Sequence, residues 1–114
     1  MKLPLLKKAF VQQAKVTDYL LSSTHPGGQA KARFFLGLGF QPAQWTLLAD
    51  ALCRVETTNE VFSSVESAHG TRYTVDGFLE APDGRSPKVR TVWIIETNCV
   101  GPRLVTAYPV EIRA

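Results

Sequence analysis

The second half of the sequence contains three extended segments joined by connections that are too short to hold a crossover helix. Residues 71–77 alternate between apolar and polar side chains, as a half-buried strand does. Residues 88–97 contain the continuous apolar run Val92-Trp93-Ile94-Ile95, which is typical of a central strand, and residues 103–110 form a third segment. Strands joined by short turns, here at 82–84 and 98–102, must run antiparallel. This half therefore predicts an antiparallel meander.

The first half has helical periodicity instead. Apolar side chains recur at three- and four-residue intervals over residues 14–22, 29–38 and 42–54. Pro42 suits the first turn of the third helix, where its missing N–H is not needed. Gly39 follows the second helix at the place where a C-terminal glycine cap is expected. The sequence thus predicts three helices before the sheet.

Two segments lack a clear period. Residues 9–11 are predicted to form a short strand, because their apolar spacing does not continue as a helix. Residues 56–68 are polar and rich in Ser and Thr, so we expect a loop there. The resulting fold class is α+β, a single domain over 1–114 with N-terminal helices packed on the C-terminal sheet.

Composition narrows the class of protein. The chain has 114 residues, 45% of them hydrophobic and 20% charged, which is typical of a globular domain. No apolar run approaches the roughly 20 residues of a membrane span. Cys53 and Cys99 have no partner at metal-ligand spacing, and no signal peptide precedes them, so we expect reduced thiols in a cytoplasmic protein. No zinc spacing or Walker-type loop is present, and the sequence calls for no metal or cofactor.

The charge is unevenly distributed. Residues 1–34 contain six Lys and Arg residues against one Asp, whereas the remainder has seven basic and nine acidic residues. A basic end on a nearly neutral body permits binding to a polyanion such as RNA. A solvated lysine surface would give the same composition, so the charge alone does not decide between the two.

His25 is the most conspicuous candidate for chemistry. It lies in a loop six residues before Lys31 and eight before Arg33, just ahead of the second predicted helix. A histidine can transfer protons near neutral pH, and cations at a helix start can hold a phosphate. These are the groups that RNA cleavage without a metal requires. The simpler interpretation is that His25 only supports its loop by hydrogen bonding.

The last predicted strand carries a second polar cluster. Strict alternation places Arg103 on one face with residues 105 and 107, and Thr106 with Tyr108 on the other. Thr106 and Tyr108 could then act together as two hydroxyl groups beside the helices. Equally, they could be ordinary strand residues.

Several blocks of the sequence together resemble domain-of-unknown-function family 6883, over nearly the whole chain. Gln29 stands where we would expect a basic residue. The blocks are Leu3-Pro4, Lys15, Tyr19-Leu20-Leu21, His25-Pro26, Gly28, Lys31-Ala32, Phe34-Phe35, Leu38-Gly39, Gly70, Tyr73, Val75, Pro82-Asp83-Gly84-Arg85, Val92-Trp93-Ile94-Ile95 and Pro102 to Tyr108.

This resemblance implies a bacterial toxin paired with a small antitoxin protein. The order of helices and sheet also resembles the metal-independent ribonuclease toxins that include barnase, the RelE type and colicin D. By that analogy, His25, Lys31, Thr106 and Tyr108 would be catalytic, and Arg33 and Arg103 would bind the RNA substrate. A non-catalytic module that binds protein or nucleic acid is the alternative hypothesis, and an enzyme acting on a small molecule is a third.

Overall fold

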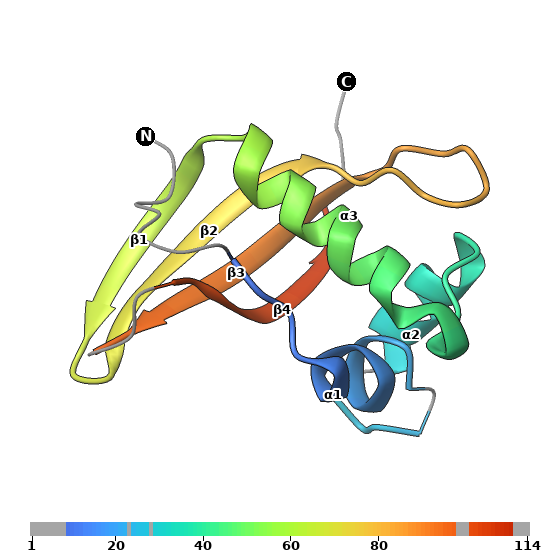
Figure 1. Ribbon diagram of the computed structural model, residues 1–114, viewed down its shortest axis with the longest axis horizontal. Coiled ribbons are helices and arrows are strands. Elements are labelled where there is room, and N and C mark those ends of the chain that lie inside the picture. Colours follow the sequence, from blue (N-terminus) through green and yellow to red (C-terminus); the bar gives the residue numbers. More distant parts are fainter. Residues whose placement is uncertain (1–8, 23, 28, 98–100, 111–114) are drawn as a thin grey trace.

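The computed structural model describes residues 9–22, 24–27, 29–97 and 101–110. Its helical half precedes its sheet, as the sequence predicts (Figure 1). The elements are α1 Gln13–Lys15, the π-helix η1 Val16–Leu20, α2 Gln29–Gly37, the 3-10 helix η2 Pro42–Gln44, α3 Trp45–Thr58, β1 Val61–Ser67, β2 Gly70–Phe78, β3 Lys88–Glu96 and β4 Arg103–Pro109.

The four strands form one antiparallel sheet in the order β1-β2-β3-β4, so each strand pairs with its neighbour in the sequence. The helix α3 crosses one face of this sheet, and α1 and α2 lie together near one end of it (Figure 1). The α+β class and the antiparallel meander are confirmed. The face of the sheet that packs under the helices is called the inner face below, and the opposite one the outer face.

The loop expected over residues 56–68 is wrong. The helix α3 continues to Thr58, and Val61–Ser67 is a full edge strand. Sequence periodicity could not reveal this strand, because nearly every side chain along it is exposed and burial imposes no alternation. The short strand predicted at residues 9–11 is present as a single parallel bridge between Phe10 and Arg103.

The pairing of β3 with β4 contains one irregularity. Val92 pairs with Thr106, but the next residue, Trp93, pairs with Leu104. Val105 is therefore an extra residue on β4, the arrangement of a β-bulge. Bulges change which face the following side chains occupy, and they are common at sheet edges.

The bulge corrects the faces predicted for β4. Leu104 and Ala107 are both buried although they are three residues apart. Arg103 consequently lies on the same face as Thr106 and Tyr108, not on the opposite one as simple alternation predicts. This is the outer face. The inner face is occupied by the buried residues Leu104 and Ala107, which pair with the buried residues Trp93 and Thr91 of β3.

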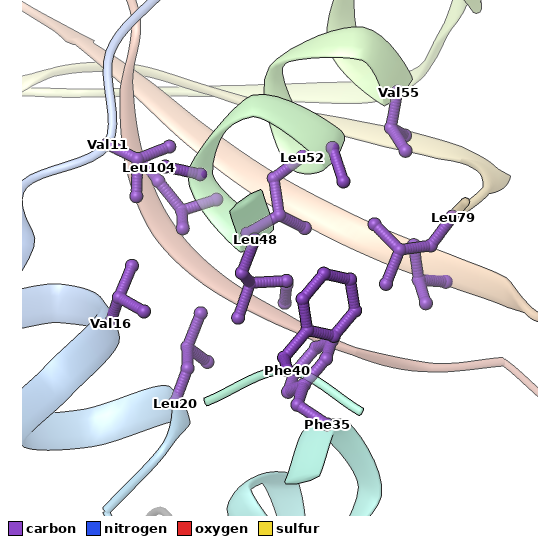
Figure 2. Packing of buried hydrophobic residues seen from close by; sticks show 14 of the residues in the cluster. Val11, Val16, Leu20, Phe35, Phe40, Leu48, Leu52, Val55, Leu79 and Leu104 are labelled. Carbon is purple, nitrogen blue, oxygen red and sulfur yellow. The ribbon is translucent and has the colours of Figure 1, made fainter. Parts of the chain in front are cut away.

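The core lies between the inner face of the sheet and the helices (Figure 2). Trp93 is fully buried at its centre, and its indole N–H donates to the hydroxyl of Thr91 at 2.8 Å. That hydroxyl in turn donates to the carbonyl oxygen of Val75 at 2.7 Å. The indole N–H of Trp93 and the hydroxyl of Thr91 are thus both satisfied within the sheet. Val16 and Leu20 of η1 reach the same core, which fixes this short helix against the rest of the protein.

The end of α2 is fixed by a glycine cap and by the turn between β2 and β3. Gly39 has φ of +101°, and the N–H groups of Gly39 and Phe40 donate to the carbonyls of Leu36 and Phe35, which is a Schellman motif. The prediction for Gly39 is confirmed. Arg85 also donates to the carbonyl of Gly37 at 2.9 Å. These bonds hold α2 in place relative to the sheet.

Candidate functional site

Tyr19 is the residue around which the candidate site is built. It belongs to η1, whose flanking residues Val16 and Leu20 are buried, so the ring has a fixed base. The N–H of Leu21 donates to the carbonyl of Val16, five residues earlier, which defines the π-helical turn. Such turns recur at functional sites. The phenol hydroxyl of Tyr19 hydrogen-bonds to the hydroxyl of Thr106 on β4 at 3.1 Å.

Two lysines flank the ring of Tyr19. The ammonium of Lys15, one helical turn earlier, lies 5.2 Å from the ring centroid. The ammonium of Lys31, from α2, lies 5.5 Å from it and also donates to the carbonyl of Gly27 at 3.4 Å. Both distances are within the range of cation–π attraction. Both ammonium groups therefore contact the Tyr19 ring, and two positive charges lie close together beside it.

His25 contacts the same ring. The centroids of its imidazole and of the Tyr19 ring are 5.0 Å apart, with an angle of 74° between the planes. Its Nδ1 accepts a hydrogen bond from the N–H of Gly27 at 3.0 Å. When Nδ1 is an acceptor, the neutral imidazole carries its proton on Nε2. In this arrangement His25 offers a donor beside Tyr19.

This environment changes the acidity of Tyr19. Burial raises the pKa of its phenol, but the hydrogen bonds from Thr106 and Lys31 and the charges of Lys31 and Lys15 lower it by more. The net result is a pKa below the ordinary value of 10.0. The physical cause is that the phenolate form is stabilised by a hydroxyl and two ammonium groups. Tyr19 is thus a stronger acid than an ordinary tyrosine.

An open depression of about 430 Å³ adjoins Tyr19. We call it the Tyr19 pocket. It has room for a small group such as a phosphate, and its lining includes the cation Lys15 as well as the carboxylate of Asp18. The lining residues are Gln12, Ala14, Lys15, Asp18, Tyr19 and His25.

Three of the residues singled out in the sequence meet at Tyr19. His25, Lys31 and Thr106 come from a loop, from α2 and from β4, and each contacts the Tyr19 side chain. The helical spacing of Val16, Tyr19 and Leu20 favours a core position for Tyr19, so the sequence offered no reason to assign chemistry to Tyr19 or to Lys15. The signal that could have identified them is the spacing of four residues, which places both on one side of a helical turn.

The other three residues lie elsewhere. The side chain of Tyr108 interacts with Arg90, which also forms a two-bond ion pair with Asp76 on the outer face. Arg103 is paired with Glu96 at 2.6 Å. Arg33 is exposed on α2. None of these three side chains lines the Tyr19 pocket.

The remaining features of the described residues concern metal ligands, membrane-spanning helices and cysteines. Within the ranges that the structure describes, no three His, Cys, Asp or Glu side chains gather as metal ligands would. In the same ranges, no helix has the length and apolar character needed to cross a membrane. The thiol of Cys53 points to the carbonyl of Ala9 at 3.8 Å, and Cys99 lies outside the described residues.

Comparison with known proteins identifies the family. The family described as domain of unknown function 6883 (DUF6883) matches residues 2–111, and the chain belongs to it. No curated protein matches at a significant level. A solved structure with a similar fold is the contact-dependent growth inhibition toxin–immunity protein complex from Klebsiella pneumoniae 342. The match has a TM-score of 0.72 and 18% sequence identity, and covers 89% of this chain and 92% of that one.

Proposed function

We propose that this protein is a ribonuclease-type toxin that cleaves RNA in the cytoplasm without a metal ion and is held inactive by a small immunity or antitoxin protein. The observation that carries the proposal is the convergence of Lys15, His25, Lys31 and Thr106 on the acidified phenol of Tyr19. A proton donor and two cations beside an open pocket are what phosphodiester cleavage requires.

The proposed reaction is an internal transfer at phosphorus. The 2′-hydroxyl of the ribose loses its proton to the imidazole of His25, and its oxygen attacks the adjacent phosphorus. The bond from phosphorus to the 5′-oxygen breaks, and Tyr19 gives its proton to that leaving oxygen. The products are a 2′,3′-cyclic phosphate and a 5′-hydroxyl. The ammonium groups of Lys15 and Lys31 stabilise the charge on the phosphate and on the phenolate.

His25 must change its tautomer to act as the base. In the structure its acceptor nitrogen is Nδ1, which holds the N–H of Gly27. Accepting a proton at Nε2 requires the proton to move to Nδ1 and that hydrogen bond to break. The bond is exposed, so water can replace it, at a cost of about 1 kcal/mol. This cost is equivalent to less than a tenfold change in rate, whereas general base catalysis raises a reaction rate by about 10²–10⁴-fold.

Two other observations support the proposal. The fold is shared with a chain of a solved contact-dependent growth inhibition toxin–immunity protein complex, at 18% identity. The basic N-terminal third of the chain favours a polyanionic substrate. In this proposal Arg33, which is exposed on the same helix as Lys31, guides RNA toward the pocket. Tyr108 and Arg103 hold the outer face together.

The test is cleavage of purified RNA in the presence of a chelator, together with growth of a bacterial host after induction. Tyr19→Phe and His25→Ala are expected to reduce the rate by about 10²–10⁴-fold each and to abolish growth arrest. The matched controls are Tyr108→Phe and His69→Ala, the latter at the other histidine, which is exposed in the turn between β1 and β2.

Further results distinguish catalysis at the Tyr19 site from binding without catalysis. A 2′-deoxy substitution at the cleaved position should block the reaction, because the attacking oxygen is missing. Full activity in both Tyr19→Phe and His25→Ala would reject the assignment of the site. RNA binding that weakens in these variants, with no turnover by the wild type, would instead support a non-catalytic binding module.

A further inference from the structure

The outer edge of β1 differs from the rest of the sheet. β1 is the first strand in the order β1-β2-β3-β4, and no described residue pairs with its other side. Every residue from Phe62 to Ser67 is exposed. At the opposite edge, in contrast, Phe10 forms a bridge to β4. The β1 edge therefore offers backbone N–H and carbonyl groups to another chain.

The same strand exposes large apolar side chains. Phe62 and Val65 are each 64% exposed, and Phe78 on the neighbouring strand is 60% exposed. The guanidinium of Arg90 lies 4.6 Å from the centroid of the Phe62 ring, which keeps this ring on the outer face. These three residues make up half of the exposed large hydrophobic residues in the described part of the chain. Apolar surface that lies along this side of the sheet indicates a protein contact.

The strand has little of the usual protection of a sheet edge, apart from the break in register with β2 between Val61 and Ser63. Natural edges are blunted by Lys, by Pro or by short strands. β1 has seven residues, its sequence Val61–Ser67 contains no Lys, Arg or Pro, and its one charge is Glu66. Between Arg54 and Arg72, in fact, the sequence has only acidic charges. The strand itself thus carries one negative charge and no positive one, although Arg72 on β2 and Arg90 on β3 lie beside it.

We propose that the immunity or antitoxin protein docks on β1 by adding an extended strand to this edge. The proposal rests on the proposed function. Backbone hydrogen bonds would supply affinity, apolar side chains of the partner would cover Phe62 and Val65, and a Lys or Arg of the partner would pair with Glu66. A second copy of this chain fits less well, because β1 contains Glu66 and no Lys or Arg, so a second β1 strand supplies no basic side chain to pair with Glu66.

The position of this surface separates it from the catalytic proposal. Tyr19 contacts β4, at the other edge of the four-stranded sheet. A partner anchored on β1 consequently need not imitate RNA in order to be recognised. Changes on β1 should alter affinity for the partner while leaving RNA cleavage intact, so the two proposals can fail independently.

The experiment measures binding of the purified protein encoded by the reading frame adjoining this gene, by titration calorimetry. Val65→Ser removes apolar contact and Glu66→Lys reverses the charge, and each is expected to raise the Kd by about tenfold or more. Leu47→Ser is the control, since Leu47 is also exposed, at 47%, but lies on α3. All three variants should cleave RNA as the wild type does.

Hydrogen exchange on the complex locates the contact. We expect slower exchange of the backbone amides of residues 61–67 when the partner is bound. Unchanged affinity in both β1 variants would overturn the proposal, as would protection confined to residues 12–31. A free chain that is already a dimer with protected β1 amides would overturn it in favour of self-association. None of these outcomes depends on whether the wild type cleaves RNA, which is measured without the partner.

Discussion

The two edges of the sheet differ in how far the rest of the chain covers them. At the β4 edge, the N–H of Phe10 donates to the carbonyl of Pro102 at 3.0 Å, and Thr106 holds the hydroxyl of Tyr19. At the β1 edge, Phe62 and Val65 remain 64% exposed. One edge is covered by the N-terminal half, and the other is left open.

This difference shows how one small sheet can carry two kinds of surface. Covering β4 fixes polar groups from three elements around Tyr19, which is what a catalytic site needs. An open, apolar edge fixes nothing by itself but is suited to receive a strand from another protein. Catalysis and recognition by a partner are therefore expected to be separable by mutation, and the following predictions test that separation.

The largest effect is expected at Gly70, which begins β2 beside the open edge. Its φ is +144°, and a Cβ there would overlap the carbonyl oxygen of Ile95. Gly70→Ala should lower the free energy of unfolding by about 3 kcal/mol, because backbone strain and a steric clash add. Gly84→Ala is the control, since Gly84 also has positive φ, +90°, but its Cβ would meet nothing within 4 Å.

Chemical denaturation of both variants checks this prediction. We expect a loss of about 1 kcal/mol for Gly84→Ala, from backbone strain alone. Equal losses at the two glycines would contradict the expected steric clash at Gly70.

The second prediction concerns Glu56, near the end of α3 that leads into β1. Glu56 is 1% exposed, and both carboxyl oxygens lack a hydrogen-bond partner in the described structure. Burial raises its pKa above the ordinary 4.5. A carboxyl group with a raised folded-state pKa contributes stability below the unfolded-state pKa, and this contribution is lost as the pH rises through the folded-state value.

Replacing Glu56 should therefore stabilise the protein at neutral pH. We expect Glu56→Met to raise the free energy of unfolding by about 2 kcal/mol at pH 7, and by less below pH 4.5. Glu56→Gln separates charge from polarity. It removes the same titrating group, so its gain should have the same pH dependence as that of Glu56→Met, but it should be smaller because the buried amide is still polar. Thermal unfolding at several pH values measures both. A Glu56→Met protein that is less stable than the wild type at pH 7 would show that the carboxylate has a stabilising role.

The third prediction tests the covered edge. Thr106→Val removes the hydroxyl that bonds Tyr19 while keeping the shape of the side chain. The value of kcat/KM for RNA cleavage should fall by about tenfold, the equivalent of one hydrogen bond. Thr74→Val is the matched control, because Thr74 pairs with Val92 from β2 just as Thr106 pairs with it from β4. Equal effects of the two changes would contradict a specific role for Thr106.

The smallest effect is expected in the pH dependence of cleavage. As the acid, Tyr19 must be protonated, so the rate should fall as the pH rises through its pKa, which lies below 10.0. Lys31→Met removes a cation that lowers this pKa, and should move the fall to higher pH. Lys88→Met, on β3 far from the site, should not move it. An unchanged profile in Lys31→Met would show that another group is the acid.

Much of the fold could be predicted from the sequence. The helices over residues 29–38 and 42–54 and the strands over 71–77 and 88–97 follow from local periodicity and turn residues. β1 could not be predicted, because an exposed edge strand leaves no apolar pattern to detect. The bulge at Val105 was equally hidden, since it depends on how β4 registers with β3.

Only part of the candidate site could be predicted from the sequence. His25, Lys31 and Thr106 stood out as residue types suited to phosphate chemistry, but nothing local connected them. Tyr19 joins them in the structure, through a hydroxyl contact with Thr106 that spans 87 positions of the sequence. Tyr19 was overlooked because an aromatic residue at helical spacing is usually a core residue.

The sequence by itself determined the order of the helices and of the strands β2 to β4, because helical periods, alternation and turn residues act over a few neighbouring positions. It also determined that positive charge gathers in the first third of the chain and negative charge around Val61–Ser67. Only the tertiary structure decided which edge of the sheet is covered, and which polar side chains share the ring of Tyr19. Those outcomes depend on how η1 and α2 pack beside β4, and packing between distant segments leaves no trace in local pattern.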